Sequence, residues 1–253
     1  MTKKYNTIIF DQGGVLIDLH VERCISAFRK LMGADNMARV LGFDDRRHQE
    51  ENTNTQKEIS EDIYKRREDS SNTDKCKEPN GIIAVSVAGS RLMKDYERGN
   101  ITTTMFINSV LAHCYKPVKS DDVRAAWFAM LGELPLARLE YAKQLRKNGY
   151  RVYMLSNTND MHWEFVRKNY PIEECFDRMF LSHEMHLAKP GQEMFEQVVR
   201  TIHTLSRTDG KGEYEPHRTI FIDDLALNRE AAERFAGWHT CESIDMLKKI
   251  MNQ

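Results

Sequence analysis

Short apolar runs rich in β-branched and aromatic residues alternate with longer amphipathic stretches along most of the chain. Several of these runs are apolar at consecutive positions, which is typical of strands covered on both faces of a sheet. The predicted strands are Tyr5–Phe10, Arg151–Leu155, Arg178–Leu181, Thr219–Ile222 and Trp238–Cys241. Because helical patterns separate the later strands from one another, the chain is predicted to form a parallel α/β sheet.

Three helices are predicted before and between these later strands. Leu136–Asn148 follows Pro135 and precedes Gly149, which are residue types favoured at the start and just past the end of a helix. Gln192–Leu205 carries its apolar residues on one stripe, and Asn228–Ala236 ends before a glycine.

The stretch between the first and second predicted strands has almost no strand signal. Its apolar residues follow helical spacing over His20–Met32, Thr102–Tyr115 and Asp121–Leu131. A helical insert of roughly a hundred residues is too long for a connecting loop and predicts a second module. Within it, residues 45–90 are mostly charged and polar, which indicates a solvated insertion.

Composition narrows the range of functions. The net charge is −1, from 37 Lys and Arg against 38 Asp and Glu, so no long-range field favours nucleic acid or an acidic membrane. No apolar run approaches the roughly 20 residues that span a bilayer, and no signal peptide is apparent. The five cysteines are scattered, as is typical of reduced thiols. We therefore expect a cytoplasmic protein that binds neither nucleic acid nor a membrane.

Four polar segments follow predicted strands, where ligands bind in open parallel sheets. Asp11 comes directly after the first strand and is followed by two glycines, which permit a tight turn and close approach of a ligand. Ser156 and Asn157 end the second strand and offer hydroxyl, amide and backbone donors for phosphoryl oxygens.

The other two segments are Lys189-Pro190 and Asp223-Asp224. The lysine is a compact positive charge that can neutralise a phosphate and a carboxylate. The adjacent acids repel each other and suit a cation with oxygen ligands, such as Mg²⁺. The order of the four segments is therefore consistent with phosphate chemistry at one edge of the sheet.

These segments read FDQGGVLID, LSNTN, AKP and FIDDLALN, and the chain resembles the haloacid dehalogenase superfamily over nearly its full length. It is most similar to the bacterial glucose-1-phosphatase-like phosphatases, whose cap the stretch Glu97–Thr102 also resembles. The resemblance implies a three-layer, Rossmann-like parallel-sheet core (residues 1–17 and 135–253) with an inserted helical cap (residues 18–134).

The resemblance also implies a Mg²⁺-dependent phosphatase acting on a small phosphate ester, with sugar phosphates as the leading class. The protein would be a monomer or a homodimer. Asp11 would be the nucleophile, forming an aspartyl-phosphate, while Ser156 and Asn157 hold the phosphoryl group and Lys189 neutralises the charge. The metal ligands would be Asp11, the carbonyl of Gly13, Asp224, and Asp223 directly or through water.

One position departs from many phosphatases of the superfamily, which carry a second Asp where this chain has Gly13. The loss of such an acid–base group costs about 10²–10⁴ in rate, although the glucose-1-phosphatase-like members share the glycine. Two alternatives therefore stay open: a metal-free 2-haloacid dehalogenase, and a catalytically weak domain kept for binding or regulation. From the cap, His20 and Arg23 are candidates for substrate contacts.

Overall fold

The computed structural model describes residues 3–43 and 90–252. Five parallel strands form one sheet in the order β3-β2-β1-β4-β5. The strands are β1 (Thr7–Phe10), β2 (Arg151–Ser156), β3 (Arg178–Leu181), β4 (Thr219–Ile222) and β5 (His239–Cys241). All five predicted strands are therefore confirmed, although the first and the last begin later than predicted.

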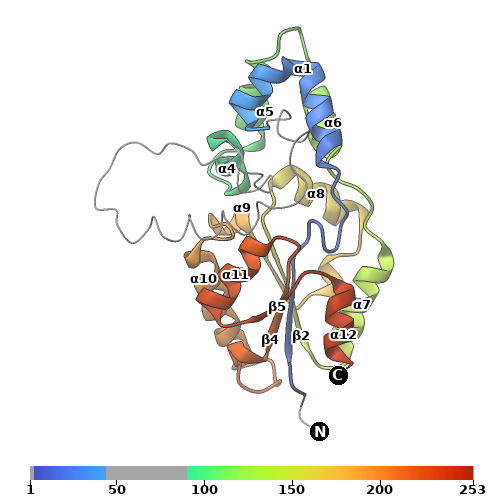
Figure 1. The fold of residues 1–253 in the computed structure, drawn as a ribbon, viewed down its shortest axis with the longest axis vertical. Coiled ribbons are helices and arrows are strands. Elements are labelled where there is room, and N and C mark those ends of the chain that lie inside the picture. Colours follow the sequence, from blue (N-terminus) through green and yellow to red (C-terminus); the bar gives the residue numbers. More distant parts are fainter. Residues whose placement is uncertain (1–2, 44–89, 253) are drawn as a thin grey trace, which may run out of the picture.

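Alternate residues of the central strand face opposite layers of helices. Ile8 and Phe10 pack with α7 (Leu136–Lys147) and α12 (Ile244–Met251), whereas Ile9 packs with α10 (Gln192–Ser206) and α11 (Ala226–Ala236). Figure 1 shows these two helix pairs on opposite sides of the sheet. Because both faces are covered, every residue of β1, β2 and β4 is buried, and the predicted three-layer core is confirmed.

A separate group of helices follows β1 and lies beyond the carboxyl ends of the strands (Figure 1). It contains α1 (Val21–Leu41), α4 (Arg91–Glu97), α5 (Thr103–Leu111) and α6 (Ser120–Phe128). These helices bury their apolar residues in one cluster of their own around Phe28, Phe106 and Trp127. They form the inserted helical cap; the exact boundaries at residues 17/18 and 134/135 stay a prediction.

The cap helices differ in detail from the predicted ones. The helix expected at His20–Met32 continues past a non-helical Gly33, whose φ of 77° kinks α1, into a second helical segment that ends at Leu41. The helix expected at Asp121–Leu131 ends at Phe128. Most of the polar insertion at 45–90, including the apolar run at 82–88, lies outside the described residues.

The remaining described elements flank the strands at their carboxyl or amino ends. Helix α8 (Asp160–Asn169) follows β2, and the short helix α9 (Ser182–Met185) follows β3. Two short 3-10 helices, Glu173–Cys175 and Pro216–Arg218, precede β3 and β4. No helix in the described part of the chain has the length and apolar character needed to cross a membrane.

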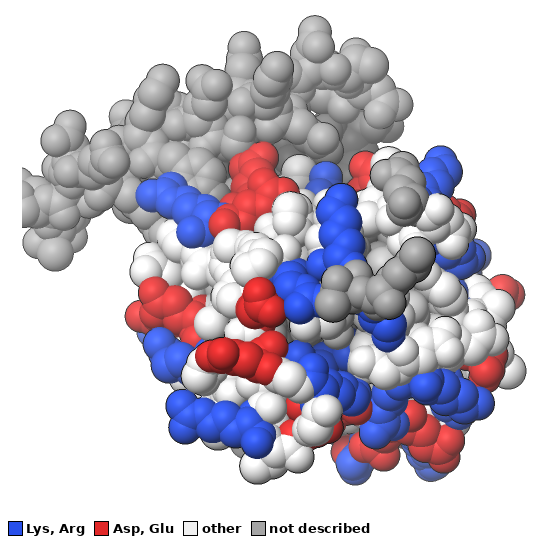
Figure 2. Space-filling model, turned by 90° about the horizontal axis from the view of Figure 1, so that it is seen from below, with Lys and Arg blue, Asp and Glu red and all other residues white. Residues whose placement is uncertain are grey.

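Figure 2 views the face on which the termini lie, and positive and negative side chains are interspersed over it. Where described residues are visible on this face, acidic and uncharged side chains interrupt the basic ones.

Candidate active site

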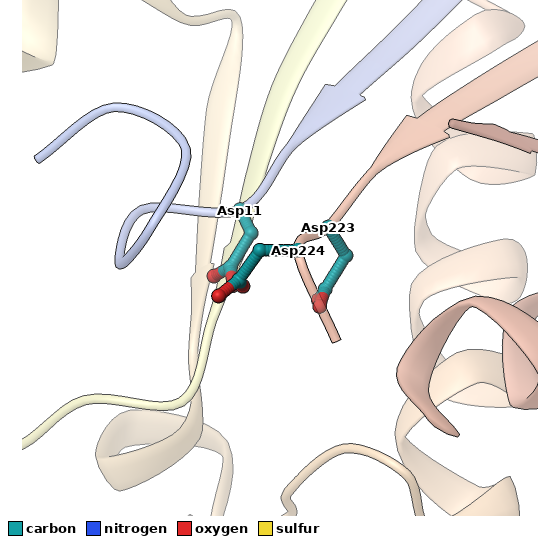
Figure 3. Close-up of side chains that lie close together, drawn as sticks. All are labelled: Asp11, Asp223 and Asp224. Atoms are coloured by element: carbon teal, nitrogen blue, oxygen red, sulfur yellow. The ribbon is translucent and has the colours of Figure 1, made fainter. Parts of the chain in front are cut away.

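The carboxyl ends of β1 and β4 bring three carboxylates together. Asp11 follows β1, and its N–H donates to the carbonyl of Ile222 at 2.8 Å, which continues the strand pairing by one residue. Asp223 and Asp224 follow β4. Oxygens of the three side chains lie within 4.8 Å of one another, and Figure 3 shows the carboxylates of Asp11 and Asp224 directed toward the same point.

Lys189 is buried between two of these acids. Its ammonium lies 3.0 Å from Asp11 Oδ1 and 2.6 Å from Asp223 Oδ2, and the lysine is 3% exposed. Burial alone would lower the pKa of Lys189, but the carboxylates of Asp11 and Asp223 outweigh this effect and raise it. The lysine is therefore a fixed positive charge at the centre of the cluster.

The two oxygens of Asp11 have different surroundings. Oδ1 accepts hydrogen bonds from the Lys189 ammonium and, at 2.6 Å, from the backbone N–H of Gln12. Oδ2 has no hydrogen-bond partner among the described residues. The pKa of Asp11 is raised to about 8, mainly by burial; Lys189 opposes this rise, and Asp223 and Asp224 add to it. A cation beside the three carboxylates would favour the ionised, nucleophilic form of Asp11.

The adjacent acids Asp223 and Asp224 have different roles in the structure. Asp223 is fully buried, and its carboxylate accepts from Lys189, from the backbone N–H of Leu225 at 2.9 Å and from the Asn228 amide at 3.1 Å. Asp224 is exposed, and within the described residues its carboxylate accepts from its own backbone N–H but from no side chain. Asp224 is thus the less engaged of the two acids, and it faces Asp11.

A glycine makes the position of Asp224 possible. At Gly14, where φ is 72°, an added Cβ would lie 2.6 Å from the carboxyl carbon of Asp224. Neither the backbone conformation nor the space allows a side chain there. Arg229 fixes the other side of the loop by donating to the carbonyls of Asp223 and Asp224, each at 2.8 Å.

Ser156 and Asn157 end β2 beside Asp11. The Ser156 hydroxyl and the Asn157 backbone N–H have no hydrogen-bond partner within residues 3–43 and 90–252, so both are available to a ligand. The Asn157 side chain is engaged elsewhere: its amide exchanges two hydrogen bonds of 2.9 Å with the backbone of Lys189. Asn157 therefore positions the lysine, and its predicted contact with phosphate would come from the backbone.

The other predicted residues contact groups outside the three carboxylates. Gly13 is in contact with Leu19, whose Cδ1 would lie 2.9 Å from an added Cβ. Asp18, the nearest acid in sequence, pairs with Arg138 at 2.8 Å and does not replace the missing second Asp. Arg23 lines an open groove between α1 and α6, and none of the three clustered acids is among the residues that line this groove.

His20 precedes α1 and lies 3.6 Å from Glu22, so no contact with the cluster supports its predicted role. The histidines of α9 and its end, His183 and His186, belong to the connection leading to Lys189. Among the described residues, the metal-type cluster contains neither of them.

Sequence reasoning missed several residues that build this edge. Four residues hold the loops at this edge through hydrogen bonds, and none of them is among the site residues predicted from the sequence. They are Thr158, Asn159, Ser182 and Arg229. One signal was available for Asn159, because an Asn before an amphipathic run is a favoured helix N-cap; its side chain accepts from His162 N–H.

Known proteins that are similar to this chain include phosphatases and other hydrolases. A curated relative, the D-ribitol-5-phosphate phosphatase of Bacteroides thetaiotaomicron, is 25% identical over 227 residues, covering 87% of this chain and 84% of the relative. A haloacid dehalogenase (HAD) family enzyme from the same species, solved in complex with magnesium and inorganic phosphate, is 29% identical with a TM-score of 0.64. The match covers 94% of this chain and 93% of that one.

A predicted HAD-like hydrolase from Porphyromonas gingivalis shares the fold, with a TM-score of 0.66, 23% identity and 99% coverage of both chains. The family model for haloacid dehalogenase-like hydrolases matches residues 5–235, which include all four polar segments at the sheet edge. This chain therefore belongs to the haloacid dehalogenase-like hydrolases.

Proposed function

We propose that this protein is a Mg²⁺-dependent phosphatase that hydrolyses a small phosphomonoester through an aspartyl-phosphate on Asp11. The observation that carries the proposal is the arrangement of Asp11 and Asp224, two carboxylates with free oxygens directed at one point, beside the buried charge of Lys189. The relatives support the same chemistry, since one is a phosphatase and another binds magnesium and phosphate.

The donor set fits Mg²⁺. Carboxylate oxygens around one Mg²⁺ at about 2.1 Å are at most about 4.2 Å apart, so the observed cluster within 4.8 Å needs only small side-chain shifts. Asp11 and Asp224 would be direct ligands, together with the Gly13 carbonyl. Asp223 is engaged by Lys189 and Asn228, which favours a contact through water. When bound, the ion would supply positive charge to the phosphoryl oxygens.

Asp11 and water carry out the two chemical steps. Asp11 Oδ2 attacks phosphorus, the bond to the ester oxygen breaks, and the leaving alkoxide takes a proton from water and leaves hydroxide. A second water then attacks the phosphorus of the aspartyl-phosphate and gives its proton to that hydroxide. The bond between Asp11 and phosphorus breaks, which releases inorganic phosphate and returns the carboxylate. The Ser156 hydroxyl and the Asn157 N–H hold phosphoryl oxygens, while Lys189 balances their charge.

Asp224 also argues against the dehalogenase alternative. A haloacid carries its own carboxylate, which an unpaired acid beside the nucleophile would repel in the absence of a cation. The substrate class that we propose is a sugar phosphate or polyol phosphate. The 25% identity to a D-ribitol-5-phosphate phosphatase supports this class.

The test is phosphate release from p-nitrophenyl phosphate and from a panel of sugar and polyol phosphates, with Mg²⁺ and with EDTA. We expect Mg²⁺-dependent release, and acid quenching during turnover should trap a phosphate that hydroxylamine removes from the protein. A well-folded protein that releases no phosphate from any ester would overturn the proposal in favour of the dehalogenase or the binding domain.

A further inference from the structure

The segment that follows β2 hydrogen-bonds to two helices of the cap. The indole N–H of Trp127, on α6, donates to Asn159 Oδ1 at 3.1 Å. The backbone N–H of Met161 donates to the hydroxyl of Tyr96, on α4, at 3.2 Å. Both acceptors and donors are buried. The cap thus contacts the chain within five residues of Ser156, where the proposed phosphate-binding groups lie.

The hydrogen bonds around Trp127 have only one possible direction. His162 Nε2 lies 3.1 Å from the carbonyl of Trp127, and because a carbonyl only accepts, Nε2 carries the proton. His162 Nδ1 therefore accepts from Asn159 Nδ2, at 3.4 Å. That leaves Asn159 Oδ1 to accept from Trp127 and from the His162 backbone. The rings of Trp127 and His162 also stack at 5.1 Å.

The same segment holds the central lysine. Asn157 exchanges two hydrogen bonds with the backbone of Lys189, and Thr158 donates its N–H to Ser182 Oγ at 2.9 Å. Ser182 Oγ in turn lies 2.6 Å from the carbonyl of Glu97 in the cap. Residues 157–161 therefore connect cap helices α4 and α6 to the groups that surround Asp11.

From these contacts we propose that Trp127 is a positioning residue, whose indole N–H sets the conformation of residues 156–159 and thereby the affinity of the site for the phosphoryl group. The inference rests on the proposed function. If the hydrogen bond is lost, Asn159 Oδ1 keeps only the His162 N–H, and the segment can relax away from the geometry that Ser156 and Asn157 require.

The test compares Trp127→Phe with Trp238→Phe. Each change removes one buried indole N–H and keeps an aromatic ring. Trp238 donates to the Tyr214 hydroxyl at 2.7 Å and packs in the α10/α11 layer, so it serves as a matched control remote from the cap. The readouts are the dissociation constant of inorganic phosphate with Mg²⁺ by calorimetry, KM and kcat for the hydrolysed ester, and the melting temperature.

We expect Trp127→Phe to weaken phosphate binding about five- to tenfold, the equivalent of one hydrogen bond, with Trp238→Phe within twofold of wild type. Equal phosphate affinities in the two variants would overturn the inference, even if both lose the same thermal stability. Should Trp127→Phe fail to fold, Tyr96→Phe removes the acceptor of Met161 N–H and is expected to act in the same direction.

The same measurements test the proposed function and the role of Trp127 separately. A wild-type protein that binds phosphate but hydrolyses no ester would overturn the phosphatase, while its phosphate affinity would still test Trp127. A wild-type protein that binds no phosphate with Mg²⁺ would overturn both.

Discussion

The edge of the sheet and the cap that covers it bury different kinds of side chain: ionisable at the edge, apolar in the cap. At the edge, three ionisable side chains are buried together, with the Lys189 ammonium within hydrogen-bond distance of both Asp11 and Asp223. The cap's interior is an apolar cluster centred on residues such as Phe28 and Phe106, and its buried polar contacts with the core run through neutral side chains.

This difference indicates which region serves the chemical step and which serves binding and stability. Buried charges are costly unless they are paired, so their concentration at one edge indicates a site where charge must be handled during a reaction. The neutral, directional contacts of the cap hold geometry without adding charge. Changes at the edge should therefore affect the chemical step, and changes at the cap contact should affect binding and stability.

The largest effect is expected from Asp11→Asn. The amide is isosteric with the carboxylate but cannot form an acyl-phosphate, so turnover should fall by on the order of 10⁴-fold or more. The measurement is steady-state phosphate release at saturating Mg²⁺. Asp18→Asn is the matched control, since Asp18 pairs with Arg138 outside the cluster and should retain near wild-type turnover. A comparable loss in both variants would contradict the assignment of the nucleophile.

The second-largest effect on turnover is expected from Lys189→Met. Removing the ammonium leaves Asp11 and Asp223 facing each other without a counter-charge, which should cost about 3 kcal/mol of unfolding free energy. Turnover should fall about 10²–10³-fold because the phosphoryl charge is no longer balanced. Urea unfolding with and without Mg²⁺, together with kcat, checks this. Lys211→Met removes a lysine ion pair with Asp177 on the protein's surface and should leave kcat unchanged.

The adjacent acids give a sharper comparison within the edge itself. Asp224→Asn should raise the Mg²⁺ concentration for half-maximal activity by at least about tenfold, with little change in stability, because the free carboxylate is the lost ligand. Asp223→Asn should instead reduce stability, since Asp223 holds Lys189 and Asn228. The measurements are Mg²⁺ titrations of activity and urea unfolding of both variants; identical behaviour would contradict the separate roles.

The smallest effect on activity is expected at the contact between Trp127 of the cap and Asn159 and His162 of the core. Burial lowers the pKa of His162 from 6.5 to about 4, so between these values the unfolded chain binds a proton that the folded protein does not. Stability contributed by the neutral ring is complete above pH 6.5 and declines as the pH falls, by up to about 3 kcal/mol near pH 4.

The check is the difference in urea-unfolding free energy between wild type and His162→Gln from pH 4 to pH 7. A difference curve is needed because burial raises the pKa values of Asp11 and Glu97 and gives these groups the opposite slope. The exposed His217→Gln is the control. A wild-type curve parallel to that of His162→Gln would show that His162 does not titrate in this way.

Much of the architecture could be read from the chain. The strands β2, β3 and β4 lie at the predicted positions within one residue, because consecutive apolar residues bounded by polar ends mark strands covered on both faces. Helices α4, α8 and α12 were not predicted. They are short or amphipathic with many charges, and their stability comes from packing against the sheet and the cap.

The sequence by itself determined the family, the parallel sheet and the polar segments at its edge, since these depend on local periodicity and on residue types at strand ends. Only the tertiary structure decided the individual surroundings of those residues. Several donors bind the Asp223 carboxylate, whereas the Asp224 carboxylate accepts from no side chain of the described residues. The Asn157 side chain hydrogen-bonds to the backbone of Lys189. The tertiary structure also brought Trp127 of the cap onto Asn159 of the core. The physical reason is that a hydrogen bond between residues 32 positions apart depends on how two packed layers meet, and no local pattern in the chain encodes that distance.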